Sequence, residues 1–206
     1  MRPLPRLHAI TDAALLSHPE LGIRAAAIAA AGSAVALHAR ARGSGGALLA
    51  SAAQRLLSLA RPPEATVFVN ARSDVAAAVG AHGVQLGRDD LTPADARRVL
   101  RGWIGCSVHT MDEAAAAVKE GADFLVVGNV YESASHPGRP AAGLDLVRQT
   151  SRLGLPIIAI GGITAARAPE VWDAGAYGVA AIRALWEAPD PAAAALDLLR
   201  PWAAAE

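Results

Sequence analysis

The chain has 206 residues, of which 53% are apolar and 18% are charged, and its 19 basic residues balance its 19 acidic residues. This length fits one globular domain, and a balanced charge excludes a general electrostatic attraction to nucleic acids or to anionic membranes. The single cysteine, Cys106, excludes an internal disulfide and a cysteine-rich metal site. We therefore expect a cytoplasmic protein that has neither a nucleic acid nor a membrane as its partner.

Two kinds of apolar segment alternate along the chain. Short continuous apolar runs bounded by Gly, Asp or Pro are typical of strands buried on both faces, and longer Ala- and Leu-rich runs with interspersed charges are typical of helices. The expected strands are Leu7–Thr11, Ser33–Arg40, Ala65–Asn70, Gly83–Leu86, Trp103–Val108, Ala122–Val127, Pro156–Ile160 and Tyr177–Ile182. The expected helices lie near residues 20–31, 45–60, 72–80, 92–100, 111–120, 143–153, 164–174 and 190–204.

A weak internal repeat supports this order of elements. The segments Gly80–Val84, Gly121–Leu125 and Gly175–Val179 each end a helix with glycine and enter an apolar strand. Eight strand–helix units in about 200 residues is the minimum for a closed barrel, so we predict one α/β domain, a (β/α)8 TIM barrel, over residues 1–206. The alternative, an open doubly wound sheet, is disfavoured because Ile10-Thr11-Asp12 stands where a glycine-rich dinucleotide-binding turn would follow the first strand.

Polar residues follow six successive expected strands, and the active site of such a barrel forms where its strands end. On the second strand His38 and Arg40 share one parity, so we expect both to point into the barrel. An inward arginine, with Arg42 on the following loop, suggests an anionic substrate, although Arg42 would equally serve as a plain surface charge. Asn70 and Ser107 end the third and fifth expected strands and are further candidate site residues.

A pair of glycines ends the seventh expected strand. Gly161 and Gly162 would expose backbone N–H groups, and the late loops of a barrel commonly bind phosphate. The exit of the eighth strand, at Ala181 and Ile182, would supply a second set of N–H groups. The alternative is that the two glycines only make a tight turn.

Two other segments carry candidate ligands. Asp90, beside Asp89, could hold Mg²⁺ together with substrate phosphates, or these aspartates could cap the following helix. The long loop over residues 131–140 is dense in hydroxyls, Gly and Pro, as are loops that cover a substrate. Within it Ser133 and Ser135 are candidates for binding phosphate oxygens, and His136 is a candidate for proton transfer.

Together these segments resemble the thiamine phosphate synthase superfamily, including its TenI branch of thiazole tautomerases. The resemblance runs from Leu7 to about Leu185 and implies a (β/α)8 barrel that binds a thiazole phosphate at Gly161, Gly162 and the loop after the eighth strand. In the synthase branch, a Mg²⁺-bound pyrimidine diphosphate ionises to a carbocation, which the thiazole nitrogen traps with release of diphosphate. In the tautomerase branch, a base aromatises the thiazole carboxylate phosphate without a metal. The resemblance is carried by Leu7–Asp12, Arg40 with Arg42, Asn70, Gly83–Gly87 with Asp90, Gly105–His109, Gly121–Asp123, Tyr131–Ser135, Ala159–Thr164 and Gly175–Ala180.

The chain departs from the synthase pattern at its charged positions. Ala71 stands where the synthase has an aspartate that helps to hold Mg²⁺, so Asp90 is left as the matching metal ligand. Ser133, Ser135 and His136 stand where the synthase has two threonines and a lysine on the diphosphate. Arg42 replaces a second lysine and conserves its charge but not its geometry.

The chain also departs from the tautomerase pattern. Asn129 stands where the tautomerases have a histidine after the sixth strand, and an asparagine cannot act as a general base. A tautomerase would then need His136 or His38 for proton transfer, or would act mainly by positioning. The residue patterns of Leu7–Asp12 and of the segment that follows Val130 nevertheless resemble the tautomerase branch more closely.

The sequence leads us to expect a thiazole tautomerase without a cofactor, with His136, Asn129 and Ser107 as candidate catalytic residues. The close alternative is a thiamine phosphate synthase that uses Mg²⁺ and takes both thiazole phosphate and pyrimidine diphosphate, and a noncatalytic phosphate-binding barrel is a third. A sugar-phosphate isomerase or aldolase is disfavoured because the only lysine, Lys119, falls in a helix. Tryptophans on the late helices would either form the face of a homo-oligomer or pack against neighbouring helices; they are Trp172, Trp186 and Trp202.

Overall fold

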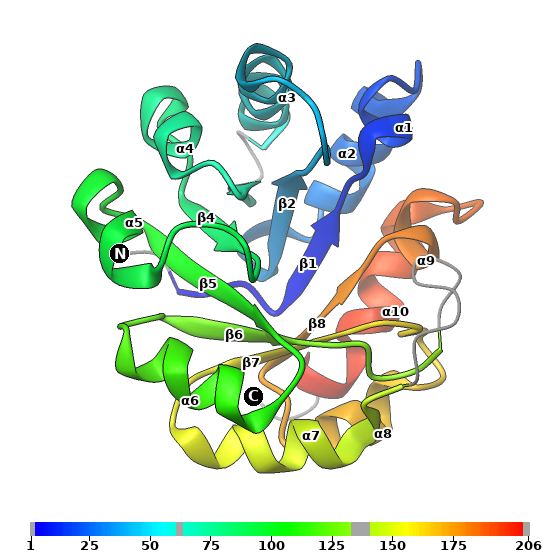
Figure 1. Ribbon diagram of the computed structural model, residues 1–206. Coiled ribbons are helices and arrows are strands. Elements are labelled where there is room, and N and C mark those ends of the chain that lie inside the picture. The colour runs from blue at the N-terminus through cyan, green and yellow to red at the C-terminus, as the bar shows by residue number, and fades with distance from the viewer. Residues whose placement is uncertain (1–2, 61–63, 133–140, 204–206) are drawn as a thin grey trace.

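The computed structural model describes residues 3–60, 64–132 and 141–203. In it, eight parallel strands follow one another around a closed barrel, and β1 pairs with β8 to close it (Figure 1). The predicted (β/α)8 barrel is therefore confirmed. The strands are β1 (Leu7–Ile10), β2 (Val35–Ala39), β3 (Thr66–Asn70), β4 (Gly83–Leu86), β5 (Trp103–Val108), β6 (Phe124–Val127), β7 (Ile157–Ile160) and β8 (Gly178–Ala181).

The helices lie outside the ring of strands (Figure 1). Two of them begin at threonine N-caps: the hydroxyl oxygens of Thr92 and Thr110 accept hydrogen bonds from the N–H groups of Asp95 and Glu113, which satisfies otherwise unpaired donors. The helices are α1 (Ala13–Leu16), α2 (Leu21–Ala29), α3 (Gly46–Leu59), α4 (Ser73–Val79), α5 (Pro93–Val99), α6 (Met111–Lys119), α7 (Gly143–Thr150), α8 (Ala168–Asp173), α9 (Arg183–Trp186) and α10 (Pro191–Ala203).

Most strands are one or two residues shorter than predicted, and α1 and α9 are short helices outside the predicted set; two of the differing boundaries have a clear local cause. The second strand begins at Val35 rather than Ser33, because a 3-10 turn, η1 (Gly32–Ala34), precedes it. Helix α8 begins at Ala168 rather than near residue 164, with a proline in its first turn, where the missing N–H costs nothing. Residues 161–167 are thereby left as a loop at the mouth of the barrel.

The centre of the barrel is filled by aromatic rings that face glycines. Phe68 and Phe124 are fully buried and meet edge to face, with their ring centroids 5.7 Å apart. A Cβ atom on Gly83 would lie 2.4 Å from the Phe68 ring, and one on Gly105 would lie 2.2 Å from the Phe124 ring. These two positions therefore require glycine, because the large rings use the space that a side chain would occupy. Around them lie the other apolar residues of the inner cluster: Leu4, Ile10, Ala36, Val126, Ile158 and Ala180.

The late tryptophans mostly pack inside the protein. Trp186 and Trp202 are buried, and the Trp202 indole N–H donates to the carbonyl of Ala176 at 3.1 Å. Trp172 is 42% exposed. Trp186 and Trp202 therefore pack against neighbouring elements, as in the interpretation that assigns the late tryptophans to helix packing. None of the helices in the described part of the chain combines the length and hydropathy that crossing a membrane requires.

Candidate active site

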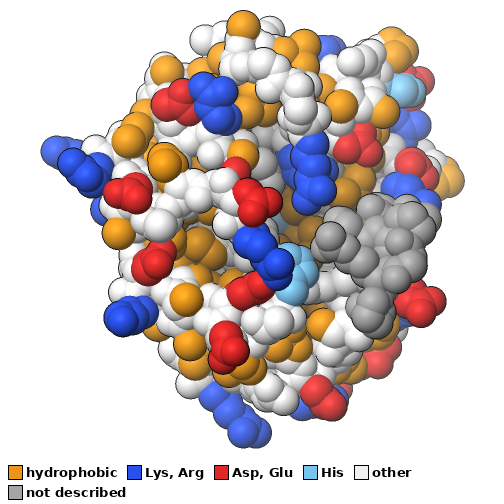
Figure 2. Space-filling model, viewed as in Figure 1, with side chains coloured by type: hydrophobic (Ala, Val, Ile, Leu, Met, Phe, Trp, Pro, Cys, Tyr) orange, Lys and Arg blue, Asp and Glu red, His pale blue; other side chains and the backbone are white. Residues whose placement is uncertain are grey.

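Two adjoining cavities open at the end of the barrel where the strands end. The first, which we call the glycine cavity, measures about 470 Å³ and is lined by the segments that follow β6, β7 and β8. The second, which we call the arginine cavity, measures about 570 Å³ and is lined mainly by the ends of β1 to β5. Figure 2 shows basic, acidic and histidine side chains gathered around a hollow in the middle of one face of the molecule. The residues that line both cavities are His109, Gly128, Ile160 and Ile182.

Arg40 and Arg42 line the arginine cavity, as the sequence led us to expect. The hydroxyl of Thr11, just past β1, donates to the carbonyl of His38 at 2.7 Å and accepts from the N–H of Arg40 at 3.0 Å, which ties the ends of β1 and β2 together. Burial and the neighbouring charge of Arg42 lower the pKa of Arg40, and Asp12 opposes this shift. The half-buried Arg40 guanidinium remains charged at neutral pH, so this cavity suits an anion.

His38 points into the barrel, as predicted, but it does not line either cavity. Its ring stacks on Phe68 with the centroids 5.0 Å apart, and burial lowers its pKa to about 4. His38 is therefore neutral at pH 7 and lies beneath Asn70, which does line the arginine cavity. This position gives no support to His38 as the proton-transfer residue of a tautomerase.

Ser107 lies in the wall of the arginine cavity beside Gln85 of β4. The Gln85 side-chain Nε2 donates to the Ser107 hydroxyl at 3.0 Å. Because that hydroxyl oxygen already accepts a hydrogen bond from Gln85, its own O–H group is available to donate a hydrogen bond to a ligand oxygen. The Gln85 Oε1 atom is buried close to Gly105 and has no hydrogen-bond partner among the described residues.

Asp89 and Asp90 line the arginine cavity from the loop after β4. One carboxylate oxygen of Asp90 accepts from the N–H of Gly87 at 2.6 Å, which holds the loop after β4 and leaves the other oxygen to the cavity. Ala71, at the place of the absent aspartate, lines the same cavity with a left-handed backbone at φ 69°. Across the described residues no cluster of three or more His, Cys, Asp or Glu side chains is placed to hold a metal.

The donor set of the arginine cavity still fits Mg²⁺ in a limited way. Mg²⁺ commonly takes only one or two carboxylates from the protein and completes its shell with water and substrate phosphates. Asp90 and Asp89 supply carboxylates at a cavity whose arginines favour a phosphate-bearing ligand. A Mg²⁺ ion here would depend on its substrate for most of its ligands.

Gly161 and Gly162 line the glycine cavity and allow two loops to approach closely. Both have a positive φ, and a Cβ atom on Gly161 would lie 2.1 Å from Asn129 Oδ1. Within the described segments, the N–H groups of Gly162 and Ile163 donate to no protein acceptor that we find. The glycines therefore make a tight turn, and the N–H groups of Gly162 and Ile163 are left without a protein acceptor among the described residues. Phosphate binding by this turn stays a prediction.

Several other groups complete the glycine cavity. Asn129 lines it beside the glycines, and Ala181 and Ile182 line it from the end of β8, just before α9. Arg167 donates to the carbonyl of Gly162 at 2.8 Å, and its guanidinium lies 4.4 Å from the centroid of the Tyr131 ring. These contacts hold the loop after β7 against the loop after β6.

Sequence reasoning missed some cavity residues as candidates. His109 lines both cavities, and its Nδ1 lies 3.4 Å from Oε2 of Glu113, a carboxylate that also pairs with Arg88. The sequence signal was its place at the end of β5, two residues after Ser107. The predicted site residues Ser133, Ser135 and His136 lie outside the described residues.

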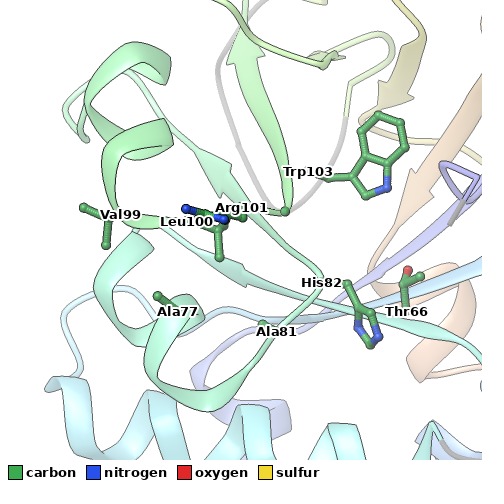
Figure 3. Close-up of a pocket in the computed structure, with 9 residues that line it drawn as sticks. Thr66, Ala77, Ala81, His82, Val99, Leu100, Arg101 and Trp103 are labelled. Carbon is green, nitrogen blue, oxygen red and sulfur yellow. The ribbon is translucent and has the colours of Figure 1, made fainter. Parts of the chain in front are cut away.

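A third cavity, of about 450 Å³, lies at the opposite end of the barrel (Figure 3). Its labelled residues include Thr66 and Trp103, which begin β3 and β5, and His82, which precedes β4. The His82 ring accepts a hydrogen bond from the N–H of Val67 at 3.0 Å and so serves the structure of the barrel. Because catalytic groups of such barrels gather where the strands end, this cavity is not part of the active site.

The fold and the two cavities define a (β/α)8-barrel enzyme whose site lies at the carboxyl ends of the strands. More particularly, the chain belongs to the thiamine monophosphate synthase family, whose model matches residues 7–185. It is thus an enzyme of thiamine biosynthesis, and the sequence-based recognition of this family is confirmed.

Known relatives agree with this assignment. A thiamine-phosphate synthase of Thermus thermophilus is 47% identical over 147 residues, which are 70% of this chain and 71% of that protein. The thiamine phosphate pyrophosphorylase structure from Pyrococcus furiosus has a TM-score of 0.80 and 31% identity, and the match covers 95% of this chain and 94% of that one. A 3-hexulose-6-phosphate synthase from Salmonella typhimurium, at 16% identity and a TM-score of 0.74, covers 98% of this chain and 100% of its own and shares the fold alone. The names of the closer relatives support the synthase better than the tautomerase that the sequence led us to prefer.

Proposed function

We propose that this chain is a thiamine phosphate synthase, which couples hydroxymethylpyrimidine diphosphate to thiazole phosphate and releases diphosphate. The observation that carries the proposal is the pair of adjoining cavities, which share four lining residues and are each suited to an anion. A coupling reaction needs two substrates side by side, whereas a tautomerase needs room for one. The names of the closer relatives support the same choice.

In this proposal the arginine cavity binds the pyrimidine diphosphate. Arg40 and Arg42 would hold the diphosphate oxygens and stabilise the negative charge that grows on them as the bond to the pyrimidine methylene carbon breaks. Ser107, whose oxygen accepts from Gln85, would donate its proton to an oxygen of the departing group. These residues favour bond breaking because their charges and dipoles are in place before the reaction.

The glycine cavity would bind the thiazole phosphate. The N–H groups of Gly162 and Ile163, with Ala181 and Ile182 opposite, would surround the phosphate. Asn129, which lines the same cavity, would orient the thiazole ring. The ring nitrogen would then face the carbon that loses diphosphate, and a new C–N bond would replace the broken C–O bond.

Asp90, with Asp89 beside it, would be the protein's contribution to a Mg²⁺ site on the diphosphate. When bound, the metal would supply further neutralisation of the leaving group's charge. Ser133 and Ser135 are proposed to contact the same diphosphate, and His136 to lie near it, as the sequence suggests. Under this proposal His136 is an anion-binding residue rather than a general base.

The test is to give purified protein both substrates with Mg²⁺ and to measure thiamine phosphate after its conversion to a fluorescent thiochrome. A parallel sample receives the non-aromatic thiazole carboxylate phosphate without metal. We expect thiamine phosphate in the first sample, and its rate should fall at least about tenfold in Arg42→Gln. Arg101→Gln, an exposed arginine at the opposite cavity, is the matched control and should keep the full rate. Aromatisation in the second sample without product in the first would overturn the proposal in favour of the tautomerase.

A further inference from the structure

A line of hydrogen-bonding groups crosses the buried interior of the barrel, from Pro5 just before β1 to the arginine cavity. His8 Nε2 lies 3.1 Å from the carbonyl oxygen of Pro5, and His8 Nδ1 lies 2.8 Å from His38 Nε2. His38 Nδ1 in turn lies 3.0 Å from Oδ1 of Asn70, as the side-chain amide is placed in the structure. Both rings are fully buried, and Asn70 is the member that lines the arginine cavity.

The Pro5 carbonyl determines which atom is the donor in each hydrogen bond of this line. The Pro5 carbonyl can only accept, so the proton of a neutral His8 must be on Nε2 and its Nδ1 must be an acceptor. His38 Nε2 must then donate to His8, which leaves Nδ1 of a neutral His38 as an acceptor as well. The Oδ1 atom of Asn70 cannot satisfy that acceptor. The NH₂ group can do so once the side-chain amide is turned by half a turn, which exchanges its oxygen and its nitrogen.

The surroundings of the two rings keep them neutral. His38 stacks on Phe68 at an interplanar angle of 8°, and His8 has the Phe68 and Phe124 rings with centroids at 5.5 Å and 5.4 Å. A charged imidazolium in this aromatic interior would lose its hydration, and the charge of Arg40 near His38 would oppose a second positive charge. Burial accordingly lowers the pKa of both histidines.

We propose that His8 and His38 are positioning residues that hold the Asn70 amide with its NH₂ group inward and its oxygen toward the arginine cavity. Asn70 then presents an acceptor, which repels phosphate oxygens and recognises an N–H or O–H donor of the ligand. The sequence led us to expect Asn70 as a substrate- or phosphate-binding residue, and this orientation selects the part of the ligand that it contacts. The ligand's identity rests on the proposed function, in which the donor is a group on the pyrimidine.

The proton positions can be read in the unmodified protein by nitrogen-15 NMR of the imidazole rings. At pH 7 we expect two buried neutral rings, each with a slowly exchanging N–H at Nε2 and an unprotonated Nδ1. The exposed ring of His18 is the internal reference for a fast-exchanging histidine. A proton on His38 Nδ1 at pH 7 would overturn the proposal, and this measurement needs neither a variant nor an active enzyme.

The positioning role is tested by a double-mutant cycle of His8→Phe and Asn70→Ala. We expect either change to raise KM for the pyrimidine diphosphate about fivefold to tenfold, with KM for thiazole phosphate unchanged within about twofold. Because His8 acts only through Asn70, the double variant should match Asn70→Ala alone. Equal rises in both KM values, or multiplied effects in the double variant, would show a merely structural role.

Calorimetric binding of inorganic diphosphate separates this inference from the proposed function. Because the amide oxygen faces the cavity, Asn70→Ala should leave diphosphate affinity unchanged within about twofold, whereas Arg42→Gln should weaken it at least about tenfold. A tenfold loss in Asn70→Ala would place the NH₂ group in the cavity and overturn the orientation. If the protein makes no thiamine phosphate but both the NMR and the calorimetry agree with expectation, the proposed function fails and the orientation stands.

Discussion

The two buried histidines should make the stability of the barrel depend on pH in the mildly acidic range. In the unfolded chain a histidine has a pKa near 6.5, whereas burial lowers the pKa of His38 to about 4 and that of His8 well below 6.5. The unfolded state therefore binds protons first as the pH falls. Stability should be constant above pH 6.5, fall between pH 6.5 and pH 4, and level off for His38 below that range.

The size of the effect follows from the His38 pKa. At pH 5 an unfolded histidine is almost fully protonated and the folded one is mostly neutral, so His38 alone lowers the free energy of unfolding by about 2 kcal/mol relative to pH 7. His8 adds a loss of the same sign. Asp74, whose pKa the Arg72 hydrogen bond lowers to about 2, contributes stability that is lost only below about pH 3.8, outside this window.

Urea unfolding at pH 7, 6 and 5, followed by circular dichroism, measures this dependence. His38→Gln should be less stable at pH 7 yet lose less stability on acidification, because it removes one of the two titrating groups. His18→Gln, which changes an exposed histidine, is the matched control and should keep the full dependence. A free energy of unfolding that stays flat from pH 7 to pH 5, or an equal slope in His38→Gln, would refute the reasoning.

Four further variants make three tests of the cavities and of the turn at Gly161. Ala71→Asp places a carboxylate in the arginine cavity, at a left-handed backbone position that aspartate tolerates. The Mg²⁺ concentration for half-maximal coupling should therefore fall about tenfold. An unchanged concentration would show that a side chain at this position does not reach the metal. Gly154 has a φ of 82° and open space around it, so Gly154→Ala should lower the free energy of unfolding by about 1 kcal/mol. Gly161→Ala should lower it clearly more, because the new Cβ would meet Asn129. Urea unfolding measures both, and equal losses would contradict the packing argument. Arg42→Gln should raise KM for the pyrimidine diphosphate at least about tenfold in steady-state assays and leave KM for thiazole phosphate unchanged. A rise in both KM values would contradict the assignment of Arg42 to the diphosphate alone.

The order of strands and helices was readable from the sequence because each strand is buried on both faces. Such strands are short apolar runs, and glycines at helix ends, such as Gly80 and Gly121, separate them from the helices. The start of α8 was not readable, because its first turn depends on how residues 161–167 fold against the loop after β6. Propensity alone extends that helix back to the nearest helix-forming residues.

The strand-end rule found Arg40, Arg42, Asn70 and Ser107, all of which line the arginine cavity. It did not find the positioning role that we infer for His8, because His8 lies within β1 rather than at its end. His8 shares its parity on β1 with Ile10, which faces the barrel interior, so its direction was available from the sequence. Its partner was not, because the contact with His38 depends on how far each ring reaches across the closed barrel.

The absence of a carboxylate at Ala71 and the presence of two arginines in the same cavity have a joint consequence. A carboxylate near a bound diphosphate repels it unless a cation lies between them. An aspartate in place of Ala71 would therefore stabilise the complex with diphosphate only when the metal is bound. With alanine there, Arg40 and Arg42 oppose the diphosphate charge with less repulsion from the protein. A synthase of this kind should bind its diphosphate substrate with a weaker dependence on Mg²⁺, and Ala71→Asp should restore the stronger dependence. Although the chain has zero net charge, the arginine cavity is lined by both arginines and aspartates, and under the proposed function their local balance determines how the leaving group is neutralised.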